Sequence, residues 1–328
     1  MYKRICNPFK LNSFFLFGAR GTGKTTLVRE HFAGDDVFKI DFLDPKEESA
    51  YSLNPGLLQE RLRARDVLPL TTSIYEVQKV PAVLDVVHSL IESDKMVFAL
   101  TGSSARKLKN GGANLLAGRA FLYELFPLTH IEMGSDFNLD HALNWGTLPK
   151  VCSFKSDEMC FEFLTAYAQI YLKDEIWAEH LVRNLLPFRK FLMIAAQQNG
   201  KYCNFTKIAR EIGVDFNTVK KYFQILEDTL LGFFVEPYSE SVRKRQKQAP
   251  KFYFFDLGVC RALSEILDVK LKPQTSMYGE SFEVFIVTEI YRLNRYFKTG
   301  FQLCAFMTQD GAEIDLVLQK NRSATDFN

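Results

Sequence analysis

The chain has 328 residues, of which 47% are hydrophobic and 14% aromatic, and its formal net charge is +2. A prior of about 150 residues per domain predicts roughly two or three domains, and the near-neutral charge excludes a polycation, so nucleic-acid contact would need a local basic patch. The six cysteines are scattered without a C-x-x-C pair and no apolar run reaches the ~18 residues of a membrane span, so we expect a cytoplasmic protein without zinc, disulfide or membrane contact.

The most informative motif follows the apolar strand predicted at Phe14–Phe17. The pattern G-x-x-x-x-G-K-T runs from Gly18 to Thr25, and a helical pattern follows at once. Such a P-loop points backbone N–H groups at phosphates and adds the donors of a helix start. A plain Gly-rich turn explains the composition but not this order of strand, loop and helix. We expect ATP and Mg²⁺ as cofactors, with Thr25 as the metal ligand and with phosphate contacts from Gly18, Gly21, Thr22, Gly23, Lys24, Thr25 and Thr26.

From Phe14 to about Glu132, apolar strands alternate with helical stretches, which predicts an α/β fold with a parallel sheet and helices on both faces. Asp41 and Asp44 follow the second strand and fit turn and cap chemistry. The expected strands are Phe14–Phe17, Val37–Phe42, Ser73–Val77, Val97–Thr101 and Phe121–Leu125, and the expected helices are Leu27–Phe32 and Val83–Ile91.

The third strand is irregular for a P-loop ATPase. Such an enzyme needs an apolar strand that ends in Asp, which supports Mg²⁺, followed by Glu, which polarises the attacking water. Here Glu76 stands at the position of the Glu, whereas Tyr75 stands at the position of the Asp. The preceding residues, 69–73, make a poor buried strand. We expect Glu76 to be catalytic.

Two further polar positions are candidates for catalysis. Thr101 and Ser103 end the fourth strand, where a polar side chain can contact the γ-phosphate or the attacking water. Arg119 lies in a Gly-containing turn and could neutralise phosphate charge, either in its own chain or in a neighbouring subunit. The alternatives are a plain strand-to-loop turn for Ser103 and a surface arginine for Arg119.

The second half begins with helical patterns at Phe161–Glu179 and Phe188–Gln198. Residues 204–226 then resemble a helix-turn-helix, with one helix ending at Gly213 and the next starting near Asn217. The second helix is expected to turn Asn217, Thr218, Lys220 and Lys221 outward, and Val219, Tyr222, Phe223 and Leu226 inward. This arrangement suits a recognition helix in a DNA groove, and it suits equally a module used for packing or as an ATPase lid.

A basic run follows, with five cations and no acid between Ser241 and Lys251. Such a run is usually a solvated loop, and after a helix-turn-helix it also fits a wing that neutralises phosphates. DNA contact is therefore expected, if anywhere, through residues 204–251. The segment Lys251–Gly258 reads as a strand ending in Asp-x-Gly.

Together these motifs resemble the prokaryotic AAA-type ATPases that carry a C-terminal domain of unknown function with a restriction-nuclease-like fold, over about residues 14–318. The resemblance implies ATP binding, phosphate and Mg²⁺ roles for Lys24 and Thr25, a hydrolytic role for Glu76, and a sensor role for Thr101 or Ser103. AAA-type proteins often form homo-oligomers in which an Arg of one subunit completes the site of another. Whether Arg119 acts in cis or in trans stays open.

The chain departs from this family in two places. The family has Asp where this chain has Tyr75, so nucleotide binding should survive more readily than hydrolysis. The second departure lies in the nuclease-like region, where a nuclease gathers acidic residues and a following E-x-K around Mg²⁺. Of these the chain has Glu283, on a helix with Glu289, and the strand residue Asp315. A further strand carrying E-x-K would be expected next, but Lys320 is too close to Asp315 and the chain continues as a polar tail, residues 321–328. This end reads as a truncation, so nuclease activity is not expected.

We therefore expect a P-loop AAA-type domain over residues 1–135, a helical linker and winged-helix module over 136–250, and a partial nuclease-like domain over 251–328. The expected function is ATP binding, with hydrolysis impaired at Tyr75, coupled to a DNA- or protein-binding module. Two alternatives stay open: a DNA-binding regulator in which nucleotide is only a ligand, and a degenerate remnant of such an ATPase.

Overall fold

The computed structural model describes residues 2–67, 69, 71–103, 116, 118–170, 184–238, 249–308 and 312–320. The chain divides into two compact units. The first comprises Met1–Phe126 with Asp228–Leu230, and the second comprises Pro127–Glu227 with Leu231–Asn328.

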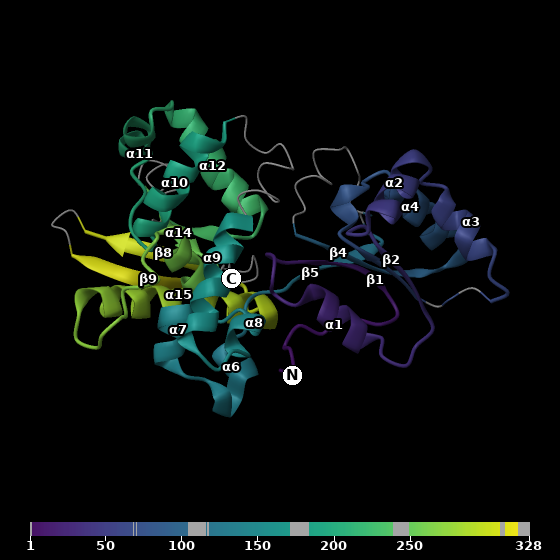
Figure 1. Cartoon of the computed structure of the whole chain (residues 1–328), viewed down its shortest axis with the longest axis horizontal. Helices are drawn as coiled ribbons and strands as arrows, with labels where there is room; N and C mark the ends of the chain where they lie inside the picture. Colours follow the sequence, from purple (N-terminus) through teal and green to yellow (C-terminus); the bar gives the residue numbers. More distant parts are fainter. Residues whose placement is uncertain are drawn as a thin grey trace, which may run out of the picture. The chain divides into compact units, whose positions relative to one another are not determined.

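The first unit is built on a five-stranded sheet of order β2-β3-β4-β1-β5 (Figure 1). All neighbouring strands in it run parallel. This confirms the parallel α/β sheet expected from the alternation of strands and helices. The strands are β1 (Ser13–Phe17), β2 (Val37–Asp41), β3 (Thr71–Tyr75), β4 (Val97–Gly102) and β5 (Ala120–Glu124), and the helices are α1 (Lys24–His31), α2 (Pro45–Leu53), α3 (Leu57–Arg63) and α4 (Val83–Asp94).

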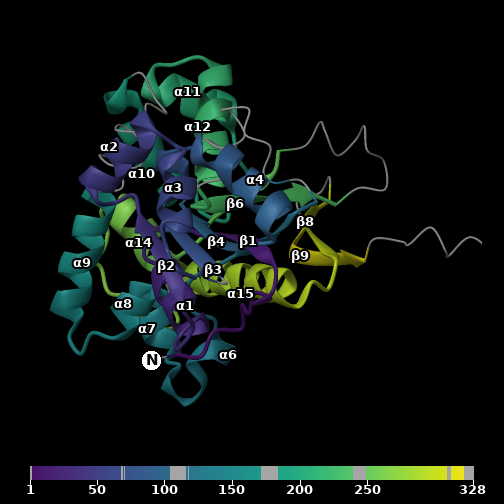
Figure 2. The same ribbon diagram turned by 90° about the vertical axis from the view of Figure 1, so that its right-hand side faces the viewer.

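Helices cover both faces of this sheet, with α1 on one face and α2, α3 and α4 on the other (Figures 1 and 2). Successive side chains of a strand point to opposite faces. Phe15 and Phe17 of β1 therefore join the core with Tyr51, Leu58 and residues of α4, while Phe14 and Leu16 are buried on the opposite face. Burial on both faces explains why the strands read as continuous apolar runs.

Strand β3 differs from the sequence prediction. It spans Thr71–Tyr75, and all of its residues are buried. The predicted segment Ser73–Val77 was two residues too far along the chain, because Val77 belongs to the 3₁₀ turn Val77–Lys79. The expectation that residues 69–73 make a poor buried strand is also wrong for 71–73. Strand β3 lies between β2 and β4, and this central position buries its hydroxyl residues.

The second unit contains a four-stranded sheet of order β7-β6-β8-β9. Strand β6 pairs antiparallel with β7 and parallel with β8, and β8 pairs antiparallel with β9. The strands are β6 (Gly232–Pro237), β7 (Lys251–Phe254), β8 (Phe301–Met307) and β9 (Glu313–Lys320), and the helices are α6 (His130–Met133), α7 (Leu139–Trp145), α8 (Pro149–Cys152), α9 (Asp157–Ile170), α10 (Leu185–Gln197), α11 (Phe205–Ile212), α12 (Phe216–Asp228), α14 (Leu257–Leu263) and α15 (Ser276–Phe297); Gly134–Asp136 is a 3₁₀ turn.

Strand β6 separates two cores. Phe233 and Val235 pack with residues of α7 and α15, whereas Phe234 faces an aromatic cluster formed with helices α10 to α12. In that cluster the ring of Phe223 lies 4.9 Å from the ring of Phe252 and 4.8 Å from that of Phe191. The hairpin of β6 and β7 thus packs against α10, α11 and α12.

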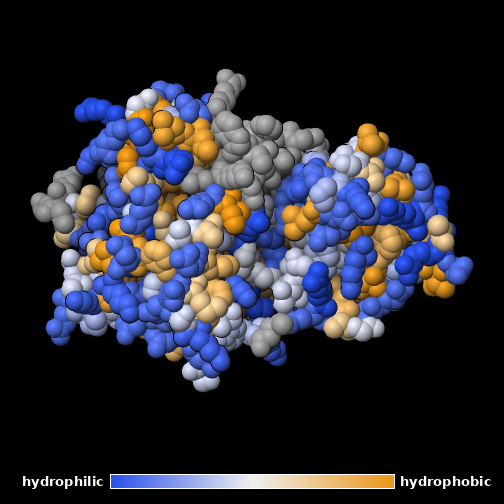
Figure 3. Space-filling model, in the orientation of Figure 1, coloured by the Kyte–Doolittle hydropathy of each residue, from blue (hydrophilic) through white to orange (hydrophobic). Residues whose placement is uncertain are grey.

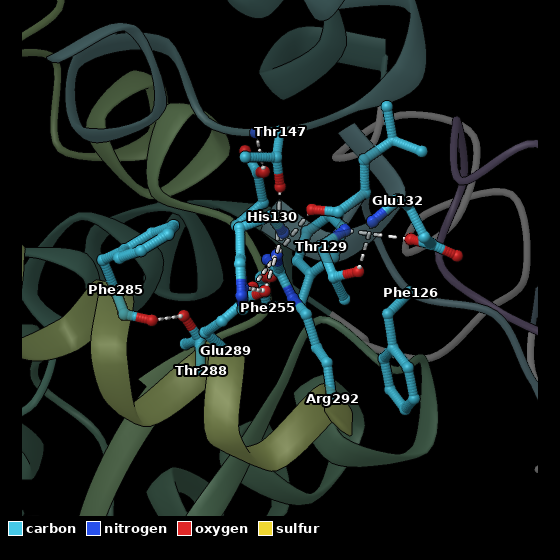
Figure 4. A network of polar contacts seen from close by, with 12 residues as sticks. Phe126, Thr129, His130, Glu132, Thr147, Phe255, Phe285, Thr288, Glu289 and Arg292 are labelled. Atoms are coloured by element: carbon cyan, nitrogen blue, oxygen red, sulfur yellow. Dashed lines mark hydrogen bonds and ion pairs between the residues drawn. The ribbon is translucent and has the colours of Figure 1, made fainter. Parts of the chain in front are cut away.

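A buried polar network ties the start of the second unit to α15 (Figure 4). The guanidinium of Arg292 donates to the backbone carbonyls of Leu128 and Phe255 and to Thr147 Oγ1. Glu289, expected on an amphipathic helix, is only 5% exposed, and its carboxylate accepts from the backbone N–H of His130 at 2.8 Å. Both buried charges thus have hydrogen-bond partners, although Glu289 Oε2 has none among the described residues and lies 3.6 Å from the guanidinium of Arg292.

Several predicted boundaries shift. The strand expected at Lys251–Gly258 ends at Phe254, because Asp256 caps α14 by accepting from the backbone N–H of Val259 at 3.1 Å. Helix α1 begins at Lys24 rather than Leu27. Ser104, residues 171–179 of a predicted helix, the basic residues at 243–247 and the tail 321–328 lie outside the described residues.

The six cysteines are all free thiols. Among the described residues, no group of His, Cys, Asp and Glu has the geometry of a metal site. In the same part of the chain, no helix is long and apolar enough to cross a membrane.

Candidate functional site

The P-loop connects β1 to α1 and takes the conformation that its glycines allow. Gly21 and Gly23 have φ of 81° and 94°, in the left-handed region that side chains disfavour. The hydroxyl of Thr22 donates to the carbonyl of Ala19 at 2.9 Å, which closes the turn. The loop therefore depends on glycine at these positions and leads directly into the first turn of α1.

Gly18 begins the loop where three strands end side by side. A Cβ on Gly18 would lie 2.4 Å from the carbonyl oxygen of Leu125, so only glycine fits between the strand ends. Its backbone N–H donates to the carbonyl of Gly102, the last residue of β4, at 3.3 Å. The end of β4 therefore lies directly beside the P-loop, as the sequence analysis expected for the fourth strand.

Lys24 is 7% exposed and lies against the loop. Its ammonium donates to the carbonyl oxygens of Gly18 at 2.7 Å and Ala19 at 3.2 Å. These acceptors are neutral, so a phosphate group entering the loop would offer the ammonium a stronger, charged acceptor. Thr25 is half-buried and Thr26 is exposed, both in the first turn of α1.

Glu76 follows β3 in a left-handed conformation, with φ of 55°. Its Oε2 accepts a hydrogen bond from Gln78 Nε2 at 2.7 Å, and the same nitrogen donates to Ser103 Oγ at 3.1 Å. The structure therefore brings together two predicted site residues, Glu76 and Ser103, through an amide that the sequence analysis did not select. The other sensor candidate, Thr101, is fully buried, and its Oγ1 has no partner among the described residues.

Tyr75 occupies the last position of β3 and is 3% exposed. Burial raises the pKa of its phenol, which the nearby charge of Arg29 partly offsets. Tyr75 is therefore a neutral group at this strand end, and a phenol does not supply the negative charge that an Asp would give to a hydrated cation. Asp41, beside it in the register of β2 and β3, accepts from the backbone N–H of Leu43 at 3.0 Å, which is the turn role expected for it.

Arg119 lies at the other edge of the sheet. It precedes β5, whose first residue, Ala120, pairs with Ser13 at the start of β1, whereas the P-loop follows the end of β1. A five-residue strand spans roughly 13–17 Å, so the structure does not bring Arg119 to the P-loop of its own chain. Its guanidinium forms an ion pair with Glu92 of α4.

A second group of charged residues lies in the second unit. The ammonium of Lys251, whose side chain is 3% exposed, lies 3.4 Å from Glu283, 2.5 Å from Glu313 and 3.2 Å from Asp315. The sequence analysis placed Lys251 at the end of a solvated basic run, and this is wrong for Lys251, because three carboxylates surround it. Glu283 and Asp315 do meet, as the resemblance implied, but around a lysine of β7.

Helices α11 and α12 are joined by a short turn at the predicted place. Helix α11 ends at Gly213 in the left-handed conformation, and Asp215 caps α12 by accepting from the backbone N–H of Thr218 at 3.0 Å. The predicted inward residues Val219, Tyr222, Phe223 and Leu226 are buried. The exposed residues of the two helices include Lys207, Arg210, Asn217, Lys220 and Lys221.

An aromatic ring accompanies these cations. Phe216 is 41% exposed, and the ammonium of Lys220 lies 4.7 Å from its ring centroid. Figure 3 shows hydrophobic residues among hydrophilic ones on the surface of these helices. The surface of α11 and α12 thus combines positive charge with an accessible ring.

Comparison with known proteins agrees with the fold of the first unit. Residues 11–134 match a family described as "AAA domain", and residues 136–270 match a family described as "Domain of unknown function (DUF8612)". Each match spans less than half of the 328 residues. The first unit, with its P-loop and parallel sheet, is therefore similar to an AAA domain, whereas the winged-helix and nuclease-like assignments have no support in these matches.

Relatives occur in bacteria and archaea. The chain is 26% identical over 306 residues to the uncharacterized protein Rv2008c of Mycobacterium tuberculosis, covering 93% of this chain and 67% of that one. It is 24% identical over 361 residues to the uncharacterized protein MJ1637 of Methanocaldococcus jannaschii, covering 94% and 73%.

Two solved structures are similar at low scores. The Aeropyrum pernix ORC1 protein in complex with DNA gives a TM-score of 0.35 at 14% identity, covering 77% of this chain and 86% of that one. The Bacillus subtilis DNA clamp loader delta protein gives 0.26 at 14% identity, covering 85% and 95%. Scores at this level do not establish a shared fold, so no inference rests on them.

Proposed function

We propose that the chain binds ATP with Mg²⁺ at its P-loop and hydrolyses it slowly. The observation that carries the proposal is Lys24, a buried ammonium held on the carbonyls of Gly18 and Ala19 in a loop whose conformation needs its glycines. In this proposal the backbone of the loop and Lys24 bind the phosphates. Thr25 would hold Mg²⁺, which would neutralise charge on the phosphate oxygens.

The residues at the ends of β3 and β4 are proposed to act on the water that attacks the γ-phosphate. Glu76 would polarise this water, and Ser103 would contact the γ-phosphate. Tyr75 removes the carboxylate that would support the hydrated Mg²⁺, while Lys24 and Thr25 remain. Binding should therefore be retained and hydrolysis should be slow.

The binding test uses two lysine variants of the same unit. Lys24→Ala should weaken MgATP binding by about 10- to 100-fold, because a charge-assisted phosphate contact contributes about 1.5–3 kcal/mol. Lys39→Ala removes an exposed lysine of β2 and should bind like the parent protein. Equal affinity of Lys24→Ala and the parent protein in a calorimetric titration would refute the proposal.

A second candidate function, a DNA-binding regulator that uses nucleotide as a ligand, is favoured by the exposed cations of α11 and α12. Each phosphate contact made by a lysine adds affinity that falls with salt. We expect the double variant Lys220→Ala, Lys221→Ala to lose DNA binding in a gel-shift assay while it retains MgATP binding. The matched double variant Lys155→Ala, Lys272→Ala removes two exposed lysines elsewhere in the unit and should bind DNA normally. An unchanged shift in the first variant would remove this candidate.

A further inference from the structure

The side chain of Gln78 joins the ends of two neighbouring strands. It belongs to the 3₁₀ turn after β3 and is 2% exposed. Its Nε2 donates to Glu76 Oε2 at 2.7 Å and to Ser103 Oγ at 3.1 Å. An amide nitrogen carries two hydrogens, so one nitrogen is sufficient for both bonds.

The chemistry of its partners fixes the orientation of this amide. A carboxylate only accepts hydrogen bonds, so the group that faces Glu76 must be the NH₂ of Gln78. The carbonyl oxygen Oε1 then points away from Glu76, and it is buried without a hydrogen-bond partner among the described residues. A buried unpaired carbonyl is costly and calls for an explanation.

Gly102 leaves the room for this arrangement. A Cβ on Gly102 would lie 2.5 Å from Gln78 Oε1, so the amide packs directly on the backbone of β4. The carbonyl of Gly102 in turn accepts from the N–H of Gly18, the first residue of the P-loop. Gln78 therefore contacts Gly102, and Gly102 is hydrogen-bonded to the first residue of the phosphate-binding loop.

We propose that Gln78 is a positioning residue that transmits the presence of a γ-phosphate at Ser103 to the carboxylate of Glu76. This inference rests on the proposed ATP site. A serine hydroxyl that accepts from Gln78 can donate its own hydrogen to a phosphate oxygen. When the hydroxyl of Ser103 turns to donate to the γ-phosphate, the hydrogen bond that its oxygen accepts from Gln78 Nε2 changes in geometry, and the same nitrogen holds Glu76. ADP lacks the γ-phosphate and leaves the amide as it is.

A kinetic test separates this role from phosphate binding. Gln78→Met keeps the length of the side chain and removes both hydrogen bonds. We expect kcat for ATP to fall about tenfold or more, because misplacement of a reacting group is costly, while KM and the affinity for ADP change less than about threefold. Gln59→Met, in α3, is the matched control and should leave kcat unchanged. An unchanged kcat in Gln78→Met would contradict the proposal.

A second measurement needs no turnover and uses the parent side chain. The side-chain amide of ¹⁵N-labelled Gln78, assigned by its absence in Gln78→Met, is followed by NMR. A non-hydrolysable ATP analogue with Mg²⁺ should shift this signal, ADP should not, and Ser103→Ala should abolish the shift. Gly102→Ala, whose Cβ would displace the amide, should also abolish the shift while nucleotide still binds.

The outcomes separate the two proposals. Equal shifts with ADP and the analogue, or a shift that persists in Ser103→Ala, would overturn the role of Gln78 and leave the ATP site intact. Absence of any saturable nucleotide binding by the parent protein would overturn the proposed function, and the role of Gln78 with it.

Discussion

Two buried lysines of this chain have opposite surroundings. Lys24 donates to the backbone carbonyls of Gly18 and Ala19 in a loop shaped by glycines. Lys251 lies among the carboxylates of α15 and β9, at 2.5–3.4 Å. Both lysines are buried, but Lys24 donates to backbone carbonyls whereas Lys251 lies among carboxylates.

The difference shows which of the two ammonium groups can bind an anionic ligand. A neutral carbonyl is replaced by a phosphate at little cost, since the new partner is a stronger acceptor. A carboxylate that already faces an ammonium has its charge compensated, and separating the two leaves buried charge unpaired. The P-loop lysine is therefore suited to binding an anion, whereas Lys251 stabilises the second unit by joining β7, α15 and β9.

The largest effect expected from this contrast is on stability. Lys251→Met should destabilise the second unit by about 2–3 kcal/mol, below the ~3–5 kcal/mol of a fully buried pair, because the three carboxylates are partly exposed. Urea unfolding followed by tryptophan fluorescence measures this unit, since Trp145 ends α7 and the other tryptophan of the chain, at position 177, also falls within residues 127–227 of the sequence. Adding Glu313→Gln should restore part of the loss. An unchanged midpoint would show that the cluster contributes nothing.

The pH dependence of the second unit gives the next effect. Burial alone lowers the pKa of Lys251, but the hydrogen bond to Glu313 and the charges around it outweigh burial and raise the pKa above its ordinary 10.5. The folded state therefore holds this proton more tightly than the unfolded state, so the stabilisation is complete below about pH 10.5 and is lost as the pH rises further. The pKa of Tyr253 is also raised, mainly by burial, and acts in the same direction.

The measurement is the urea midpoint between about pH 9 and about pH 12. The parent protein should lose stability more steeply than Lys251→Met over this range. Parallel curves for the two proteins would contradict the assignment of this dependence to Lys251.

The same substitution at the other lysine should have a smaller effect on stability. We expect Lys24→Met to lower the unfolding free energy of the first unit by less than about 1.5 kcal/mol, because the ~1.5–3 kcal/mol of hydrogen bonds from a charged donor is partly offset by the desolvation cost of a buried ammonium, which Met removes. Thermal unfolding followed by circular dichroism measures this change. A loss as large as that of Lys251→Met would break the contrast between the two lysines.

The smallest effect is expected at an exposed pair of the second unit. Lys201 lies 3.0 Å from Glu280, and both side chains are more than half exposed. Lys201→Met should therefore change stability by less than about 0.5 kcal/mol, as is typical of solvated pairs. This variant is also the matched control for Lys251→Met in the tryptophan assay. A loss of stability comparable to that of Lys251→Met would mean that the distance between the charges, and not their burial, determines how much an ion pair contributes to stability.

The P-loop and its sheet could be predicted because their signals are local. The glycine spacing from Gly18 to Gly23 specifies the loop, and apolar runs specify the strands on both sides of it. The predicted bounds of strands were wrong where contacts with neighbouring strands, and not the local sequence, determine the structure. Thr71, Thr72 and Ser73 have polar side chains, yet they form β3 because β2 and β4 enclose them.

Gln78 and Lys251 could not be found from sequence alone. Gln78 stands two residues after Glu76, but its contact with Ser103 joins residues 25 positions apart. Lys251 follows a run of basic residues, and its carboxylate partners Glu283 and Asp315 lie 32 and 64 positions away. Only the folded sheet reveals that these charges meet.

The most direct measurement is a calorimetric titration of MgATP paired with a phosphate-release assay, on the parent protein, on Tyr75→Asp and on the uncharged control Tyr75→Asn. We expect all three proteins to bind MgATP saturably, and the parent and Tyr75→Asn to release phosphate slowly. Tyr75→Asp should release phosphate at least about tenfold faster than the parent, because a carboxylate at this position supports the hydrated Mg²⁺. Absence of saturable binding to the parent protein would contradict the account, and equal release by parent and Tyr75→Asp would refute the role assigned to Tyr75.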